Sequence, residues 1–326
     1  MVPRKVNTSS CHKVGTSSLC KVGTSWEVAA PAKLNLYLEV LGKRTDGFHE
    51  LETLLVPVRI YDELRWTAET PTRGDDGCSL SIDQQFSAPQ VQPALDSHNN
   101  LVLRAARLLA QRTGVEAHGH FHLTKRIPLQ AGMGGGSSDA AASLLLANEC
   151  WQAGLANSEL ALLAAELGSD VPYFLNSGPA ICRGRGEWIE PLGDVPHLHF
   201  VLVKPAFGLS TPRVFAELSE SELPSASRSQ KSASCLEKLI AALNRGAIGT
   251  ACGWMTNRLE TAAARLAPEI PRIKAALAQA GCWGQFMTGS GSTLVGIARS
   301  ATQARRIARS LSSQQLGTVL ATASGW

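Results

Sequence analysis

The stretch after residue 27 alternates between apolar and polar side chains. Apolar residues fill one set of alternate positions and mostly polar residues the other: Leu34, Leu36, Leu38 and Val40 against Lys33, Asn35, Tyr37 and Glu39. A period of two over this length predicts a β-strand with one face buried and the other exposed. Asp46-Gly47 marks a turn, and the apolar stretch 51–60 predicts a second strand that returns from it.

Helical patterns dominate the middle and the end of the chain. Helices predicted from residue 96 or 97 to 112 and from 158 to 167 end at Gly114 and Gly168. Further helices are predicted over 137–151, 236–243 and 258–280, strands over 118–125 and 199–203, and a strand–loop–strand unit over 284–297. Strands and helices alternate irregularly, without the repeated period of a doubly wound sheet. We therefore expect an α+β protein with two domains, residues 26–190 and 191–326.

Composition excludes several classes of protein. The chain has 326 residues, of which 44% are hydrophobic and 18% charged, with a net charge of +4. This small excess is spread along the sequence, so nucleic acid is not the expected partner, while a local positive site for an anionic substrate stays open. No apolar run approaches the length of a membrane span, so no membrane association is expected. Eight cysteines without a C-x-x-C pair predict reduced thiols in a cytoplasmic protein.

The first 25 residues differ from the rest. They are rich in Ser and Thr, carry a near-repeat (KVGTSS and KVGTS), and contain no acidic residue before Glu27. This composition predicts a disordered tail over 1–25. An organelle transit peptide has a similar composition, but the segment has Arg4 as its one arginine and no amphipathic stripe, so plastid import is disfavoured.

The strongest candidate site is a glycine-rich run followed by a helix and preceded by a strand. The run comprises Pro128, Leu129, Gln130, Ala131, Gly132, Met133, Gly134, Gly135, Gly136, Ser137 and Ser138. Glycines let the backbone turn tightly and bring its N–H groups against a phosphate, and a helix beginning there adds unpaired N–H groups and a positive dipole end. The alternative is a flexible turn with a serine cap. The run lacks the lysine of a Walker A loop and the third glycine of a dinucleotide-binding loop.

Five segments together resemble the GHMP kinases (galactose, homoserine, mevalonate and phosphomevalonate kinases). The glycine run resembles the second motif of that family, and Thr288-Gly-Ser-Gly-Ser-Thr293 resembles its third. Ala30–Leu36, Arg44–His49 and Leu167–Pro172 are similar to the branch that phosphorylates 4-diphosphocytidyl-2-C-methyl-D-erythritol. The order and spacing of the motifs match from about residue 26 to residue 297. The resemblance thus covers nearly all of the chain after the tail.

This resemblance implies a fold, a reaction and a set of site residues. It implies a ribosomal-protein-S5-like ATP-binding domain, a ferredoxin-like second domain, and transfer of the γ-phosphate of ATP, with Mg²⁺, to the 2-hydroxyl of that substrate in the non-mevalonate (MEP) isoprenoid pathway. The catalytic pair falls on Lys33 and Asp170. An aspartate can accept the proton of an attacking hydroxyl, and a lysine beside it offsets negative charge. The ligands of Mg²⁺ are not indicated, and the expected assembly is a monomer or weak homodimer.

Further residues are assigned by the same resemblance. Lys125 corresponds to a lysine near the adenine pocket, and the substrate side comprises Asn35, Phe48, His49, Thr211, Phe215, Gly289 and Gly291. Phe48 stands where the family usually has tyrosine, so the ring can still stack on cytosine but any hydrogen bond from the hydroxyl is lost. Two alternatives stay open: a GHMP kinase acting on a smaller alcohol, and a catalytically silent ligand-binding regulator with the same fold.

Overall fold

The computed structural model describes residues 10–14, 17–68, 77–85, 99–176, 178–193, 195–219 and 226–325. The chain divides into two compact units, each built from separate stretches of sequence. The first comprises Met1–Ala32, Ile60–Ile127 and Gly134–Ser177, and the second Lys33–Arg59, Pro128–Met133 and Gly178–Trp326. This division differs from the expected single boundary near Glu190, because the two long strands β3 (Ser25–Lys43) and β4 (His49–Thr67) each contribute to both units.

The first unit contains a sheet in the order β1-β2-β3-β4-β6-β5. Its other strands are β1 (Ser10–Val14), β2 (Ser17–Val22), β5 (Cys78–Gln84) and β6 (Gly119–Lys125). Strands β5 and β6 are parallel, whereas β1–β2, β2–β3 and β4–β6 are antiparallel. Two strands therefore lie within the segment expected to be a disordered tail, because Leu19 to Val22 pair with the first residues of β3. Residues 1–9, 15 and 16 lie outside the described part of the chain.

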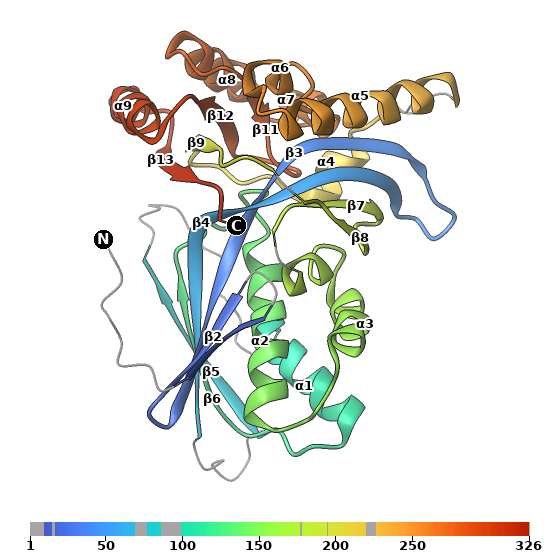
Figure 1. The fold of residues 1–326 in the computed structure, drawn as a ribbon, viewed down its shortest axis with the longest axis vertical. Helices are drawn as coiled ribbons and strands as arrows, with labels where there is room; N and C mark the ends of the chain where they lie inside the picture. The colour runs from blue at the N-terminus through green and yellow to red at the C-terminus, as the bar shows by residue number, and fades with distance from the viewer. Residues whose placement is uncertain are drawn as a thin grey trace. The chain divides into compact units, whose positions relative to one another are not determined.

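Three helices pack together beside this sheet (Figure 1). They are α1 (Leu101–Thr113), α2 (Gly135–Cys150) and α3 (Asn157–Leu167), and a short 3₁₀ helix, η1 (Pro172–Leu175), follows α3. Gly114 and Gly168 cap α1 and α3 as predicted. The start of α1 was predicted wrongly, because the side chain of Asn100 caps it by accepting from Val102 N at 2.9 Å. Residues 96 and 97 lie outside the described ranges.

The second unit contains the remaining parts of β3 and β4 with three short strands, and a separate four-stranded sheet. Strand β10 (Thr256–Asn257) pairs with β3, β7 (Ala180–Gly184) with β4, and β8 (Trp188–Pro191) with β7. The separate sheet has the antiparallel order β11-β12-β9-β13, from Gln285–Met287, Leu294–Ala298, His199–Lys204 and Thr318–Ala323. In chain order these strands and their helices give βαββαβ, which is the ferredoxin-like arrangement expected for this part.

Helices α8 (Glu269–Gln279) and α9 (Ala301–Ser312) pack on that sheet. The other helices of the unit are α4 (Thr211–Ala216), α5 (Ala226–Asn244), α6 (Ile248–Cys252) and α7 (Leu259–Leu266). The single helix predicted over 258–280 is therefore two helices. The break falls at Ala267, whose φ of −142° is extended, because the following Pro268 disfavours a helical conformation in the residue before it.

Strand β3 is buried on both faces from Val28 to Val40 apart from Ala29, which corrects the prediction of one exposed face. The polar set is covered by neighbouring segments: Lys33, Asn35 and Glu39 are each 3% exposed. Glu39 accepts two hydrogen bonds from Arg258, at 2.6 and 2.8 Å, and so keeps an ionic partner despite its burial. The apolar and the polar side chains of β3 are thus both buried. Because buried polar side chains do not serve solubility, those of β3 are candidates for a functional role.

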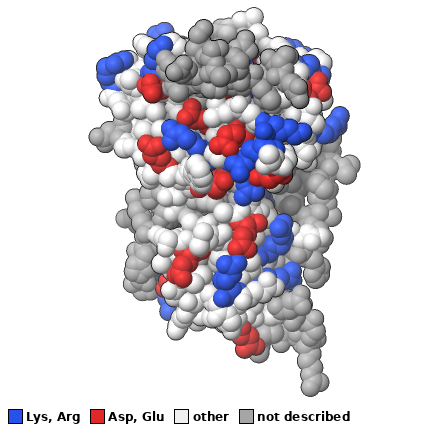
Figure 2. All heavy atoms as spheres, turned by 90° about the vertical axis from the view of Figure 1, so that its right-hand side faces the viewer, with Lys and Arg blue, Asp and Glu red and all other residues white. Residues whose placement is uncertain are grey.

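The surface carries charges of both signs. Figure 2 shows basic and acidic side chains interspersed over the face that it draws. In the part of the chain that the structure describes, no helix is long and apolar enough to cross a membrane.

Six cysteines are free thiols: Cys78, Cys150, Cys182, Cys235, Cys252 and Cys282. Cys20 is disulfide-bonded, so the prediction of reduced cysteines is wrong at this position.

Candidate active site

The first part of the glycine run, residues 128–133, packs against the glycine turn 288–291 in the second unit. A Cβ atom at Gly132 would lie 2.1 Å from the carbonyl oxygen of Thr288, and one at Gly289 would lie 2.7 Å from the carbonyl oxygen of Gly132. Both residues have positive φ, +71° and +55°. Two motifs that are 156 residues apart therefore meet backbone to backbone, at a distance that only glycine permits.

Thr288 links this contact to the buried face of β3. Its hydroxyl accepts from the backbone N–H of Asn35 at 3.0 Å and donates to Asn35 Oδ1 at 3.2 Å. Asn35 in turn donates to the hydroxyl of Thr53 at 2.9 Å, and Thr53 donates to the carbonyl oxygen of Tyr37 at 2.6 Å. The Asn35 side chain is thus held by Thr288 and Thr53 and cannot change rotamer without breaking buried hydrogen bonds.

Lys33 is fixed by the same network. Its backbone N–H donates to Met133 O at 3.0 Å, and its ammonium donates to Asn35 Oδ1 at 2.7 Å. A lysine that is 3% exposed needs compensation for its charge, and the amide oxygen of Asn35 supplies part of it. A cation in this position is suited to attract an anionic group.

The second part of the glycine run begins α2 in the first unit. Gly134, with φ +70°, precedes the helix, and Ser138 N donates to Gly134 O at 2.9 Å as the first helical bond. The N–H groups before Ser138 therefore have no partner within the helix and are available to an anion. The hydroxyl of Ser138 is buried and has no hydrogen-bond partner among the described residues.

A cluster of three buried charges lies beside this helix start. Lys125, at the end of β6, forms ion pairs with Asp62 and with Asp139, the latter at 2.6 Å. Asp62 Oδ1 also accepts from the backbone N–H groups of Arg126 and Ile127, at 2.5 and 2.8 Å. A Cβ at Gly135 would lie 3.3 Å from Lys125 Nζ, so the cluster directly adjoins the glycine run. We name Asp62, Lys125 and Asp139 the buried charge cluster.

Burial shifts the proton equilibria of the buried charge cluster. Burial raises the pKa of Asp139 far above its ordinary value of 3.8, against the opposing effect of Lys125, and Asp62 raises it further. For Lys125, burial lowers the pKa, but the two carboxylates outweigh burial and the net shift is upward. Lys125 therefore stays charged while Asp139 holds a proton more readily than an exposed carboxyl does.

Asp170 lies in the turn between α3 and η1 in the first unit. Val171 N donates to Gly168 O at 3.2 Å, which closes the turn around it, and Pro172 begins η1. The side chain is partly exposed. Lys33 belongs to the second unit, so the two residues of the predicted catalytic pair lie one in each unit.

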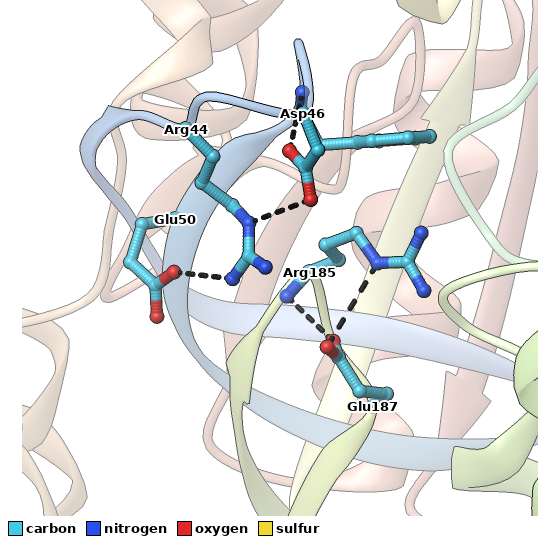
Figure 3. A network of polar contacts seen from close by, with 6 residues as sticks. Arg44, Asp46, Glu50, Arg185 and Glu187 are labelled. Carbon is cyan, nitrogen blue, oxygen red and sulfur yellow. Dashed lines mark hydrogen bonds and ion pairs between the residues drawn. The ribbon is translucent and has the colours of Figure 1, made fainter.

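The predicted substrate turn, residues 44–50, is held by ion pairs between its own side chains (Figure 3). Arg44 contacts Asp46 at 3.1 Å and Glu50 at 2.8 Å, and Asp46 Oδ1 accepts from the backbone N–H of Phe48 at 3.1 Å. The side chain of Phe48 nevertheless remains 50% exposed. A rigid turn with an exposed ring suits a planar ligand that stacks on it.

Other predicted substrate residues meet in two pairs within the second unit. The His49 ring stacks on Phe215, with centroids 4.8 Å apart and an angle of 26° between planes. Burial, with the nearby charge of Lys43, lowers the pKa of His49, so the imidazole is neutral at pH 7 and offers one donor and one acceptor. The hydroxyl of Thr211 lies 2.7 Å from that of Ser290, which joins α4 to the turn that contains Gly289 and Gly291.

The structure adds residues to which the sequence assigned no role. Thr53 and Thr288 hold Asn35 in the second unit, and Asp62 and Asp139 hold Lys125 in the first. Two of the four had a local signal: Thr288 begins the third glycine-rich motif, and Asp139 directly follows the glycine run. In the described residues no group of three or more His, Cys, Asp or Glu is arranged to hold a metal ion.

Comparison with known proteins identifies the family of this chain. The family model of the GHMP kinases N-terminal domain matches residues 100–178, and that of the GHMP kinases C-terminal domain matches 238–316. A 4-diphosphocytidyl-2-C-methyl-D-erythritol kinase from Shouchella clausii (strain KSM-K16) is 40% identical, over 86% of this chain and 89% of the relative. The corresponding enzyme from Pelotomaculum thermopropionicum is 39% identical, over 86% and 91%. The chain belongs to the GHMP kinase family.

Solved structures support the assignment. A 4-(cytidine 5'-diphospho)-2C-methyl-D-erythritol kinase superposes with a TM-score of 0.71 at 33% identity, covering 92% of this chain and 99% of the other. Mevalonate kinase from L. major gives a TM-score of 0.72 at 16% identity and shows the shared fold. The α+β GHMP kinase fold predicted from the motifs is confirmed, and the protein is a small-molecule kinase.

Proposed function

We propose that this GHMP kinase transfers the γ-phosphate of ATP to the 2-hydroxyl of 4-diphosphocytidyl-2-C-methyl-D-erythritol, a step of the non-mevalonate route to isoprenoid precursors. The observation that carries the substrate assignment is the rigid turn 44–50 with its exposed Phe48 ring, together with the relatives that bear this substrate in their names. A smaller alcohol such as homoserine has no base to stack on such a ring.

The phosphates of ATP are assigned to the glycine run. The unpaired N–H groups at the start of α2 suit the phosphate oxygens, and the contact between Gly132 and Thr288 fixes the run where it leaves the second unit. Lys125 is 2% exposed and bound by two carboxylates, so we assign it to the support of this run rather than to direct contact with adenine.

Lys33 and Asp170 are proposed as the catalytic pair. Asp170 accepts the proton of the substrate hydroxyl as its oxygen attacks the γ-phosphorus, and Lys33 stabilises the negative charge that develops on the transferring group. The hydrogen bond from Lys33 Nζ to Asn35 Oδ1 fixes the ammonium for this task. Most of the rate enhancement in phosphoryl transfer comes from such positioning and electrostatics rather than from covalent chemistry.

Kinases of this kind use Mg²⁺ to neutralise phosphate charge. The buried Ser138 hydroxyl, which lacks a partner among the described residues, fits a Mg²⁺ or phosphate ligand at the helix start. Mg²⁺ usually keeps several waters and takes only one or two protein oxygens, so a single hydroxyl with the nucleotide phosphates is a sufficient set. We further propose that the enzyme works in the cytoplasm as a monomer or weak homodimer, which sedimentation analysis can check.

A substrate panel tests the assignment. The purified enzyme with ATP and Mg²⁺ is given the cytidylated methylerythritol, homoserine or mevalonate, and ADP release is measured with phosphorus NMR of the product. Phosphorylation of the cytidylated substrate alone is expected. Turnover of a smaller alcohol at a higher kcat/KM would replace the proposed substrate, and ligand binding without turnover of any of them would identify a regulator instead of an enzyme.

A further inference from the structure

Arg185 joins the substrate turn to a second hairpin of the same unit. It lies in the turn between β7 and β8, and β7 pairs with the start of β4 so that Gly184 lies opposite Leu51. This pairing brings the β7–β8 turn beside residues 44–50. The guanidinium carbon of Arg185 lies 4.8 Å from the centroid of the Phe48 ring, within cation–π range. One face of the ring is therefore covered by a cation, and the exposed half of the side chain remains open to a ligand.

Glu187 sets the orientation of the Arg185 guanidinium. It accepts from the backbone N–H of Arg185 at 2.6 Å, and its other oxygen lies 3.8 Å from Arg185 Nε. One contact involves the backbone N–H and the other involves Nε, so the two terminal amino groups of Arg185 point away from Glu187 (Figure 3). Those amino groups have no hydrogen-bond partner in the described part of the chain.

The nearby carboxylates are occupied by other groups. Asp46 is bound by Arg44 and by the backbone N–H of Phe48, and Glu50 is bound by Arg44. Arg44 uses a terminal amino group to bind Glu50, whereas both terminal amino groups of Arg185 stay available to a ligand. A planar guanidinium with unused parallel N–H groups matches phosphate oxygens better than any other side chain does.

We infer that Arg185 is a substrate-binding residue. The face of its guanidinium packs on the Phe48 ring, and its terminal amino groups donate hydrogen bonds to the phosphates of a pyrimidine nucleoside diphosphate. This inference rests on the proposed function, and it gives the turn a hydrogen-bond donor that the Phe48 side chain lacks. The same turn then recognises base and phosphate together. Arg185 contributes to specificity because a ligand that lacks the phosphates gains only the stacking contact.

Calorimetric titration of CDP and of cytidine separates the two contacts. Arg185→Gln is expected to weaken CDP binding roughly tenfold or more, because a hydrogen bond to a charged group is lost, while cytidine binding changes less than about threefold. Arg185→Lys keeps the charge without the fork and should fall between the wild type and Arg185→Gln. Phe48→Leu removes the ring and should weaken both ligands alike. Arg306→Gln, on the exposed face of α9, is the control expected to change neither.

The outcomes separate this inference from the proposed function. In steady-state assays Arg185→Gln should raise KM for the cytidylated substrate and leave KM for ATP unchanged. Suppose that the wild type phosphorylates the cytidylated substrate. If Arg185→Gln then weakens the binding of CDP and of cytidine by equal factors, or weakens the binding of neither, Arg185 does not bind phosphate and only this inference is overturned. If the wild type neither binds CDP nor turns over that substrate, both are overturned.

Discussion

Gly132 lies so close to Thr288 that a Cβ atom on Gly132 would come within 2.1 Å of the Thr288 carbonyl oxygen. Gly132→Ala is therefore expected to lower the free energy of unfolding by about 3 kcal/mol, through strain at positive φ and overpacking against backbone. Gly114 has nearly the same φ, +74°, with nothing within 4 Å of its Cβ position. Gly114→Ala should cost only about 1 kcal/mol. Urea unfolding of both variants measures the difference, and equal losses would show that the glycine contact is not tight.

Thr288 and Thr293 are both fully buried but differ in their hydroxyl contacts. The hydroxyl of Thr288 bonds to Asn35, whereas the hydroxyl of Thr293 has no partner among the described residues. Thr288→Val should lower the free energy of unfolding by roughly 1–3 kcal/mol, because buried groups of Asn35 lose their partner. Thr293→Val should be neutral or stabilising, since it removes an unpaired buried hydroxyl. Thermal and urea denaturation of the two variants test this contrast, which fails if Thr293→Val is the more damaging change.

The buried charge cluster predicts how stability depends on pH. The folded-state pKa of Asp139 is raised above its ordinary value of 3.8, chiefly by burial. The associated stability is therefore complete below about pH 4 and is lost as pH rises through the raised pKa. The free energy of unfolding of the wild type, minus that of Asp139→Asn, should fall with rising pH across this window, by up to about 1.4 kcal/mol per pH unit. A pH-independent difference in urea titrations would contradict the assignment of a shifted proton to Asp139.

The proposed catalytic pair predicts a loss of turnover without a loss of binding. Lys33→Met and Asp170→Asn are each expected to reduce kcat by about a hundredfold or more, while KM values for ATP and acceptor change less than about threefold. Arg306→Met, at an exposed position of α9, should leave both constants unchanged. Circular dichroism and thermal melts confirm that the variants are folded. Near wild-type kcat in a folded Asp170→Asn enzyme would remove Asp170 from the mechanism.

Local chemistry made part of the fold predictable from sequence. The end of α1 at Gly114 follows from the backbone freedom of glycine, because its φ of +74° is left-handed and needs no tertiary information. Helix α3 also ends at the predicted glycine, Gly168, although the backbone there is extended. The break between α7 and α8 was also readable, since Pro268 restricts Ala267, but the continuous apolar period over 258–280 was given more weight. The ordered strands β1 and β2 were missed because Ser- and Thr-rich sequence carries no clear apolar period.

The candidate site was predictable only where residues near one another in sequence act together. The glycine run and the turn 44–50 contain their own signals. Long-range support was not predictable: Asp62 reaches Lys125 across 63 positions, and Thr288 reaches Asn35 across 253. The burial of Lys33 was missed for the same reason, because covering segments such as Met133 and Thr53 come from other parts of the chain. Roles for these residues remain predictions that the variants above test.

Strands β3 and β4 have a consequence for how the enzyme can be divided. Because the chain passes between the units at 32–33, 59–60, 127–128, 133–134 and 177–178, no single cut yields two fragments that each contain one whole unit. Neither unit is therefore expected to be expressed alone by truncation, nor exchanged with that of a relative in one crossover. Recombination in this family should succeed instead by replacing loops such as 44–50, which leave both long strands intact. Substrate preference can thus change through substitutions in loops such as 44–50, while the two long strands and the glycine run stay unchanged.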